Sequence, residues 1–235
     1  MRARPGHVAV AIGVLGELMM TAGVIVLLFV GYELWITGIF TAQAQHRLEQ
    51  QLAQQWSAPA PAGPPHPAGS PPSVDVVPLG SALAVIRAPR LGRHWHWVVD
   101  EGVAPDDLAK GPGHYPKTAL PGGVGNFVLS GHRTTHGAPF YGVDSFKAGD
   151  AIVVETRDTW FVYRVTGESI VDPSDIGVTF PVPEHAGQQP TQRLITLTTC
   201  NPRYSASQRL IVHGVLATSE PKSQGIPPAL QTGKA

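Results

Sequence analysis

The chain has 235 residues, of which 17 are basic and 17 are acidic, so its formal net charge is zero. This balance gives no electrostatic basis for binding nucleic acid, and the length leaves room for about one ordinary domain beside the non-globular segments. Glycine (26 residues) and proline (23 residues) are abundant, and most aromatic and β-branched residues fall in the second half, which favours a loop-rich all-β domain.

An apolar stretch from residue 8 to residue 40 contains two ionisable side chains, both glutamates. It is long enough to cross a bilayer, which requires ~20 apolar helical residues. Two segments within it could form the membrane-spanning helix, in a first register at residues 8–30 or in a second register at residues 18–40. A carboxylate near the bilayer centre is costly, so we favour the second register, which keeps Glu17 at the cytoplasmic interface. The sequence therefore predicts a short cytoplasmic N-terminus at 1–17 and a transmembrane anchor at 18–40.

The basic residues around this stretch indicate its orientation. Arg2 and Arg4 precede it, whereas the first basic residue after it is Arg47. This asymmetry favours a cytoplasmic N-terminus and an extracellular domain. A cleaved signal peptide is the alternative, because Ala42-Gln43-Ala44 resembles a cleavage site, but the apolar region is about twice the usual length for one. We therefore expect an uncleaved single-pass anchor in the cell membrane.

The remaining segments differ in composition. Residues 41–56 are polar, rich in glutamine and alanine, and free of glycine and proline, which predicts an exposed helical stalk. Residues 57–73 form a proline-rich linker with no fold of its own. Residues 219–235 contain proline, glycine and lysine and are expected to be a disordered tail. The folded domain is therefore expected at residues 74–218.

Short β runs separated by turn residues fill this domain. A short helix is expected over Asp100–Lys110, and Arg157-Asp158 indicates a tight hairpin. So many short strands favour a single closed or nearly closed barrel. The expected strands are Ser81–Arg87, Gly125–Ser130, Ala151–Thr156, Thr159–Val165, Gly167–Val171, Arg193–Thr199 and Leu210–Ala217.

The only cysteine, Cys200, stands at the end of one expected strand, which Pro202 terminates. If the next run pairs antiparallel with this strand, the intervening loop returns Arg209 to the side of Cys200. His132 follows the β run 126–130 and a glycine, so it also lies where a strand passes into a loop. Catalytic groups concentrate on such loops.

These three side chains suit acyl transfer. A Cys200 thiolate attacks a peptide carbonyl, His132 protonates the departing amine, and Arg209 stabilises the oxyanion or the substrate strand. By chemistry alone His136 is an equally good acid/base candidate. A lone cysteine in a β domain is also more often a small buried hydrophobe than a nucleophile. His132 and His136 lack a carboxylate or thiol at zinc-site spacing, so we expect no metal and no cofactor.

The same residues resemble a known family. Thr196-Leu197-Thr198-Thr199-Cys200 with Arg209, and Gly131-His132 upstream, are similar to the signature of sortases, the cysteine transpeptidases of Gram-positive bacteria. The similarity covers about residues 80–218 and is strongest to the class E sortases of actinobacteria. The class E resemblance rests on Gly111-Pro112-Gly113-His114-Tyr115-Pro116-Lys117-Thr118-Ala119, Pro121-Gly122, Gly125-Asn126 and Gly131-His132-Arg133.

The resemblance implies an eight-stranded barrel with short helices, preceded by one transmembrane helix. It also implies an enzyme that cleaves a C-terminal sorting signal, of LAxTG or LPxTG type, between threonine and glycine. The resulting acyl-enzyme is resolved by an amine of a cell-wall precursor. The implied partners are therefore surface proteins bearing a sorting signal, a peptidoglycan precursor and the membrane.

Site roles follow from the same resemblance. It implies that Cys200 is the nucleophile, that Arg209 positions substrate or oxyanion, and that His132 rather than His136 is the acid/base. Further substrate contacts are expected at Tyr115, Thr198 and Thr199.

Two other functions stay open at this point. An L,D-transpeptidase acting on peptidoglycan is the enzymatic rival, but such enzymes place glycine before the cysteine, where this chain has Thr199. A non-catalytic, membrane-tethered binding domain is the second rival. It predicts a buried and unreactive Cys200, whereas the enzyme predicts a thiol whose alkylation depends on pH.

Overall fold

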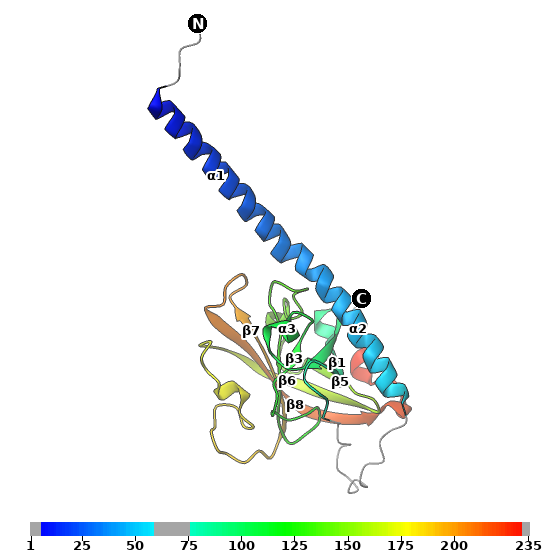
Figure 1. The fold of residues 1–235 in the computed structure, drawn as a ribbon. Coiled ribbons are helices and arrows are strands. Elements are labelled where there is room, and N and C mark those ends of the chain that lie inside the picture. Colours follow the sequence, from blue (N-terminus) through cyan, green and yellow to red (C-terminus); the bar gives the residue numbers. More distant parts are fainter. Residues whose placement is uncertain (1–5, 59–75, 232–235) are drawn as a thin grey trace.

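The computed structural model describes residues 6–58 and 76–231. Most of the predicted proline-rich linker, the first five residues of the predicted cytoplasmic N-terminus and the last four residues of the predicted tail lie outside the described residues. The rest of the chain forms one β domain and one long N-terminal helix (Figure 1).

Eight strands close into a barrel in the order β1-β2-β3-β4-β7-β8-β6-β5, which confirms the predicted all-β fold. Most neighbours are antiparallel, but β2 pairs parallel with β3 and β4 pairs parallel with β7. The strands are β1 (Ala82–Arg87), β2 (His96–Glu101), β3 (Gly113–His114), β4 (Gly125–Ser130), β5 (Ala151–Glu155), β6 (Thr159–Val171), β7 (Arg193–Asn201) and β8 (Gln208–Pro221).

Alternate residues of each strand fill the barrel interior, as the two-residue period of a strand requires. On β4 these are Phe127 and Leu129, and on β7 they are Ile195 and Leu197, all fully or almost fully buried. Tyr163 of β6 is also buried, and its hydroxyl accepts a hydrogen bond of 2.7 Å from the Gly122 N–H. Residues of even number on β4 and β7 therefore belong to the outer face.

The barrel differs from the prediction in four elements. The short helix expected over Asp100–Lys110 is present only as α3 (Pro105–Leu108), because Asp100 belongs to β2. Lys110 pairs with both Asp100 of β2 and Asp107 of α3, each at 3.0 Å. The sequence analysis missed β2 and the two-residue β3, and the two runs expected at 159–171 form the single strand β6 with a β-bulge.

Short 3-10 and α-helical turns connect the strands, as the resemblance implied. They are η2 (Pro89–Leu91), η3 (Val143–Ser145), η4 (Gly177–Thr179), η5 (Lys222–Gln224) and α4 (Pro228–Gln231).

The N-terminal helix is continuous and projects far beyond the barrel (Figure 1). It consists of α1 (His7–Gly31), a π-helical turn η1 (Tyr32–Ile36) and α2 (Thr37–Ser57). No residue of α1 is buried against the protein. By length and composition this helix is apolar enough to cross a membrane.

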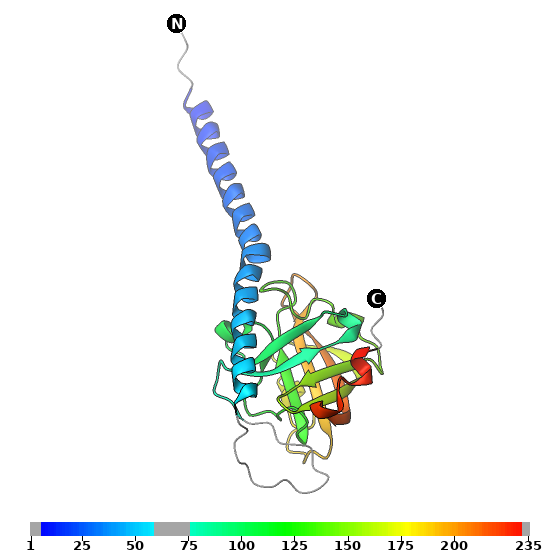
Figure 2. The ribbon, with the colours of Figure 1, turned by 90° about the vertical axis from the view of Figure 1, so that its right-hand side faces the viewer.

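The predicted stalk is helical, but it is not exposed on all sides. One stripe of α2 is buried against β1 and β2, and Figure 2 shows the helix lying along this wall of the barrel. Leu48 and Leu52 pack on Ala82, Val85 and Val98. The stripe has the three- and four-residue spacing of one helix face, which the polar composition of the segment concealed. Its members are Thr37, Thr41, Gln45, Leu48 and Leu52.

The tail predicted to be disordered is ordered up to Gln231. Strand β8 continues to Pro221, and α4 follows after a short turn. Leu230 packs on the outer face of β5 and β6, where Trp160 is buried, and Lys222 lies 2.7 Å from Glu155. The tail is ordered because these strands present apolar side chains outward, and burying them stabilises the covering segment.

Candidate active site

Cys200 and Arg209 are paired across two neighbouring strands. They face each other in the antiparallel register of β7 and β8, as predicted from the connectivity. Directly opposite residues of such a pair project to the same side of the sheet, with their Cβ atoms about 5 Å apart. Both side chains are partly exposed, so an incoming peptide has access to them.

The segment that carries His132 lies alongside β7 on the side away from β8. Strand β4 runs parallel to β7, with Ser130 opposite Thr198. His132 lies two residues beyond Ser130, and Cys200 lies two residues beyond Thr198. Because neighbouring strands are about 4.8 Å apart, this register brings the histidine segment alongside the cysteine.

Three backbone contacts hold the chain around His132. The Gly131 N–H donates to the carbonyl oxygen of Thr198 at 3.2 Å, and the Thr199 hydroxyl donates to the carbonyl oxygen of Gly131 at 2.7 Å. The Phe140 N–H donates to the carbonyl oxygen of His132 at 3.1 Å. A Cβ on Gly131 would lie 2.8 Å from the Phe140 ring, so glycine is needed for this close approach. The structure thus brings all three predicted residues to one end of the barrel.

The loop between β6 and β7 covers part of the same outer face. The Asn126 side-chain amide donates to the carbonyl oxygens of Val178 and Phe180, at 3.0 and 3.1 Å. Its oxygen accepts a 2.8 Å hydrogen bond from the hydroxyl of Thr196 on β7. This loop is therefore fixed beside the outward-facing side chains of β7, the last of which before the loop to β8 is Cys200.

The His132 ring is half-buried and contacts a second histidine. It stacks on His136 with ring centroids 4.5 Å apart and planes inclined by 21°. The Thr135 hydroxyl lies 3.4 Å from Nδ1 of His132 and 3.1 Å from Nδ1 of His136. Burial and, second, the charge of His136 lower the pKa of His132 to about 4. At neutral pH the ring is therefore largely uncharged and can accept a proton from a thiol.

The Arg209 guanidinium is held by backbone oxygens. Its Nη1 donates to the carbonyl oxygens of Ala206 and Gln208, both at 3.1 Å. Among the described residues no carboxylate lies within salt-bridge distance of it. Its charge is thus available to a carbonyl oxygen or oxyanion brought to Cys200.

A second arginine, Arg133, contributes to the site in a way that the sequence analysis missed. It is 3% exposed, and its Nη1 donates to the carbonyl oxygen of Cys200 at 3.1 Å. Its Nε donates to the Tyr141 carbonyl oxygen at 3.3 Å, and Nη2 lies 3.0 Å from Asp144. Arg203 forms an ion pair with the same carboxylate at 2.8 Å and stacks on Tyr141. Two signals for Arg133 were available in the sequence, namely its position directly after the candidate histidine and its place in Gly131-His132-Arg133.

The three residues expected to contact substrate, Tyr115, Thr198 and Thr199, differ in their exposure to solvent. Tyr115 is half-exposed on the segment after β3, and its N–H donates to the Val128 carbonyl oxygen at 2.9 Å, away from the strand end. Thr198 and Thr199 are 5% and 3% exposed. The Thr199 hydroxyl is already engaged with Gly131.

Another histidine of the class E motif, His114, lies in the domain interior. It is 1% exposed, its Nδ1 lies 2.6 Å from the Glu101 carboxylate, and its Nε2 lies 2.8 Å from the Thr118 hydroxyl. It is a satisfied core residue and does not contact the candidate site. Within residues 6–58 and 76–231, no group of three or more His, Cys, Asp or Glu side chains gathers as a metal site requires.

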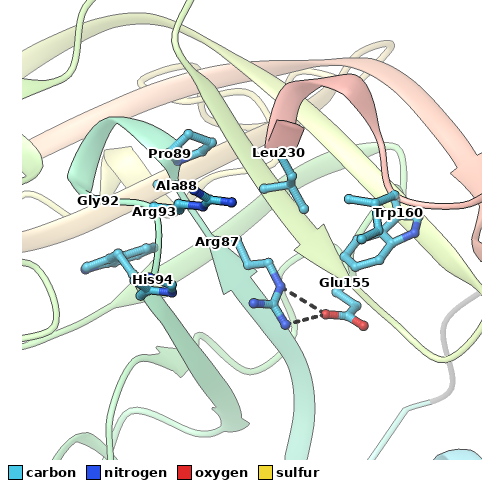
Figure 3. A pocket seen from close by; sticks show the side chains of 11 residues that line it. Arg87, Ala88, Pro89, Gly92, Arg93, His94, Glu155, Trp160 and Leu230 are labelled. Carbon is cyan, nitrogen blue, oxygen red and sulfur yellow. Dashed lines mark hydrogen bonds and ion pairs between the residues drawn. The ribbon is translucent and has the colours of Figure 1, made fainter. Parts of the chain in front are cut away.

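A cavity of about 460 Å³ lies on a different wall of the barrel. Figure 3 shows Arg87 and Glu155 joined by two hydrogen bonds at its floor, with Trp160 and Leu230 on one side and His94 on the other. Its strands are β1, β5 and β6, whereas the candidate site is on β4, β7 and β8. This cavity is therefore separate from Cys200.

Comparisons with known proteins agree with this geometry. The Sortase domain family model matches residues 86–217. The chain is 36% identical to sortase SrtE1 of Streptomyces coelicolor over 97% of its own length and 63% of that protein, so it spans less than two thirds of this relative.

Two solved structures are similar over nearly their whole length. Sortase E of Streptomyces avermitilis is 41% identical, with a TM-score of 0.60, and the match covers 66% of this chain and 99% of that one. Sortase E1 of Streptomyces coelicolor with a tripeptide in its active site is 40% identical, with the same TM-score, and the match covers 64% and 97%.

Proposed function

The chain belongs to the sortase family of cysteine transpeptidases, with class E sortases among its relatives, and we propose that Cys200, His132 and Arg209 carry its reaction. The reaction is cleavage of a C-terminal sorting signal of LAxTG or LPxTG type between threonine and glycine. The acyl group then passes to an amine of a peptidoglycan precursor. The substrates are surface proteins that carry this signal.

The proposed mechanism begins with proton transfer from the Cys200 thiol to His132. The thiolate attacks the threonine carbonyl carbon, and a carbon–sulfur bond forms. As the carbon–nitrogen bond breaks, the His132 imidazolium donates its proton to the departing glycine amine. The acceptor amine next attacks the thioester, loses a proton to His132, and displaces the Cys200 thiolate.

Arg209 supplies the fixed positive charge in this scheme. It is opposite Cys200 on the adjacent strand, and it is not consumed by an ion pair with a described residue. A guanidinium in this position stabilises the negative charge that develops on the carbonyl oxygen. Of the expected substrate contacts we retain Tyr115, which is half-exposed, and we assign the buried Thr198 and Thr199 to holding the Gly131 segment.

We further propose that the helix from residue 18 through the rest of α1 and η1 anchors the enzyme in the cell membrane, with the N-terminus cytoplasmic and the barrel outside. The anchor then ends before Thr37, because this residue already contacts the barrel. The Ala42-Gln43-Ala44 sequence lies within the docked helix α2. A peptidase would have to detach α2 to reach it, which supports an uncleaved anchor.

The observation that carries the proposal is the flanking of Cys200 by Arg209 on one strand and by the His132 segment on the other. The test is incubation of the full chain, in detergent micelles, with fluorogenic LAxTG and LPxTG peptides and an amine acceptor. We expect threonine–glycine cleavage and a transfer product with the natural chain, and neither with Cys200→Ala. Equal background signal from both proteins on all peptides would refute the proposal.

A further inference from the structure

The loop that follows His132 has an unusual backbone. Three consecutive residues, His136, Gly137 and Ala138, have φ values of 51°, 71° and 48°, in the left-handed region. Glycine adopts this region freely, but histidine and alanine do so at an energetic cost. Such a backbone persists only where neighbouring structure holds it in place.

The first turns of α2 provide this support. The Thr37 hydroxyl accepts a hydrogen bond of 3.2 Å from the His136 N–H. A Cβ on Gly137 would lie 2.8 Å from the Trp97 ring and 3.4 Å from the Thr41 methyl group, so the exposed Gly137 packs with one side against β2 and the helix. The loop that carries the candidate acid/base is thus in direct contact with the segment that leads to the membrane anchor.

The helix is itself fixed in register on the barrel. The Gln45 side chain accepts a 2.8 Å hydrogen bond from the Val98 N–H and donates a 3.0 Å bond to the carbonyl oxygen of the same residue. The Thr41 hydroxyl lies within hydrogen-bond distance, 2.8 Å, of the Ala109 carbonyl oxygen. Side chains that pair with backbone groups in both directions prevent the helix from sliding along the barrel.

From His136 the contacts continue to His132. The two rings are stacked, and the Thr135 hydroxyl lies between their Nδ1 atoms. One hydroxyl can donate to one ring and accept from the other, so this arrangement couples the tautomers of the two rings. When Nδ1 of His132 donates to Thr135, its Nε2 is free to exchange a proton with a thiol.

We propose that Thr37 is a positioning residue for the transpeptidase reaction, acting through His136 to hold the His132 ring in its working orientation. The juxtamembrane helix then completes the active-site loop of the barrel. This inference rests on the proposed function, in which His132 is the acid/base. It gives α2 a role in catalysis that a passive spacer between membrane and enzyme would not have.

A matched pair of substitutions tests the inference in the full chain, solubilised in detergent micelles. Thr37→Val removes the acceptor for the His136 N–H and keeps the side-chain shape, while Thr37→Ser keeps the hydroxyl. Thr21→Val is the control, because the Thr21 hydroxyl, like that of Thr37, donates to the carbonyl oxygen four residues earlier, but Thr21 lies in α1, away from the barrel. The assay is the peptide transfer reaction, with Cys200→Ala as background.

We expect Thr37→Val to lower kcat about tenfold, as a displaced catalytic group does, with KM changed less than about twofold. Thr37→Ser should retain most of kcat, and Thr21→Val should match the natural chain. The acid limb of the kcat/KM profile should move to higher pH in Thr37→Val, because a released His132 becomes better hydrated. Equal kcat and equal pH profiles for Thr37→Val and Thr21→Val would overturn the inference.

A second measurement separates this inference from the proposed function. Hydrogen–deuterium exchange of peptides covering residues 131–142 requires no activity. We expect faster exchange at His136 in Thr37→Val than in Thr21→Val, with unchanged exchange in β7. If the natural chain shows no transfer activity, the proposed function fails, and with it the catalytic role. If activity is present but exchange and kcat are unchanged by Thr37→Val, only the positioning role fails.

Discussion

The Arg133 guanidinium donates a hydrogen bond of 3.1 Å to the carbonyl oxygen of Cys200. Because Arg133 follows His132 directly in the chain, this buried contact ties the histidine segment to the end of the cysteine strand. A planar guanidinium is needed to reach the Cys200 carbonyl, the Tyr141 carbonyl and the Asp144 carboxylate together.

Arg133→Lys should therefore impair both stability and turnover. A lysine keeps the charge but cannot make all three contacts, so we expect a loss of about 2–4 kcal/mol in the free energy of unfolding and a fall in kcat of at least about tenfold. Arg203→Lys is the control, because Arg203 bonds the same Asp144 carboxylate from a more exposed position. Thermal unfolding and peptide transfer measure the two effects. An Arg133→Lys protein as stable and active as Arg203→Lys would contradict this role.

Arg209→Lys should affect turnover without affecting stability. The side chain is half-exposed and bonds backbone oxygens alone among the described residues, so its replacement leaves no buried group unpaired. Lysine lacks the planar set of N–H donors of a guanidinium, and this loss should lower kcat/KM about 100-fold, the usual effect of removing an oxyanion donor. Arg164→Lys, at an exposed arginine that donates to Gly149, is the control. Near-normal kcat/KM in Arg209→Lys would show that the residue has a structural role only.

The pH dependence should report the environment of His132, whose pKa is lowered to about 4 first by burial and then by the charge of His136. His136→Phe keeps an aromatic ring in the stack and removes the charge. We expect the acid limb of the kcat/KM profile to move upward by a fraction of a pH unit, because the larger cause, burial, remains. An unchanged or downward-shifted limb would exclude charge coupling between the two rings.

The same pKa makes a prediction about stability. Between pH 6.5 and about 4 the unfolded chain binds a proton at His132 that the folded chain does not. Stability should therefore be fully retained above pH 6.5 and should fall as the pH is lowered through this window. Unfolding of His132→Gln across the same range should show a shallower decline than the natural chain.

The docking of α2 should contribute measurably to stability. Leu52 is 2% exposed and packs on β1, so Leu52→Ala should lower the free energy of unfolding by about 2–4 kcal/mol. Ile39→Ala, at a residue of the same helix that is 54% exposed, should change it little. The stabilities of the two variants are compared by following tryptophan fluorescence during thermal unfolding of the full chain in detergent. Equal loss in both variants would mean that the helix does not dock through this stripe.

The many short runs with strand composition were sufficient to predict the barrel. The short loop between two neighbouring strands was sufficient to predict the pairing of Cys200 with Arg209. Both predictions depend on residues that are close together in the sequence. The parallel pairing of β4 with β7, which brings His132 alongside, joins residues 68 positions apart and had no local signal. The buried stripe of α2 was hidden for a similar reason. Its polar members, such as Gln45, bond backbone groups of the barrel, and these partners are known only once the chain has folded.

The central claim is that Cys200 becomes covalently acylated during turnover. The direct measurement is intact-mass spectrometry of the full chain, quenched in acid during reaction with an LAxTG peptide and without an amine acceptor. The account predicts an added mass equal to the peptide up to and including its threonine, less one water, located on Cys200 by digestion, removed by an added amine, and absent from Cys200→Ala. Peptide cleavage without any acylated Cys200, or with the same adduct on Cys200→Ala, would contradict it.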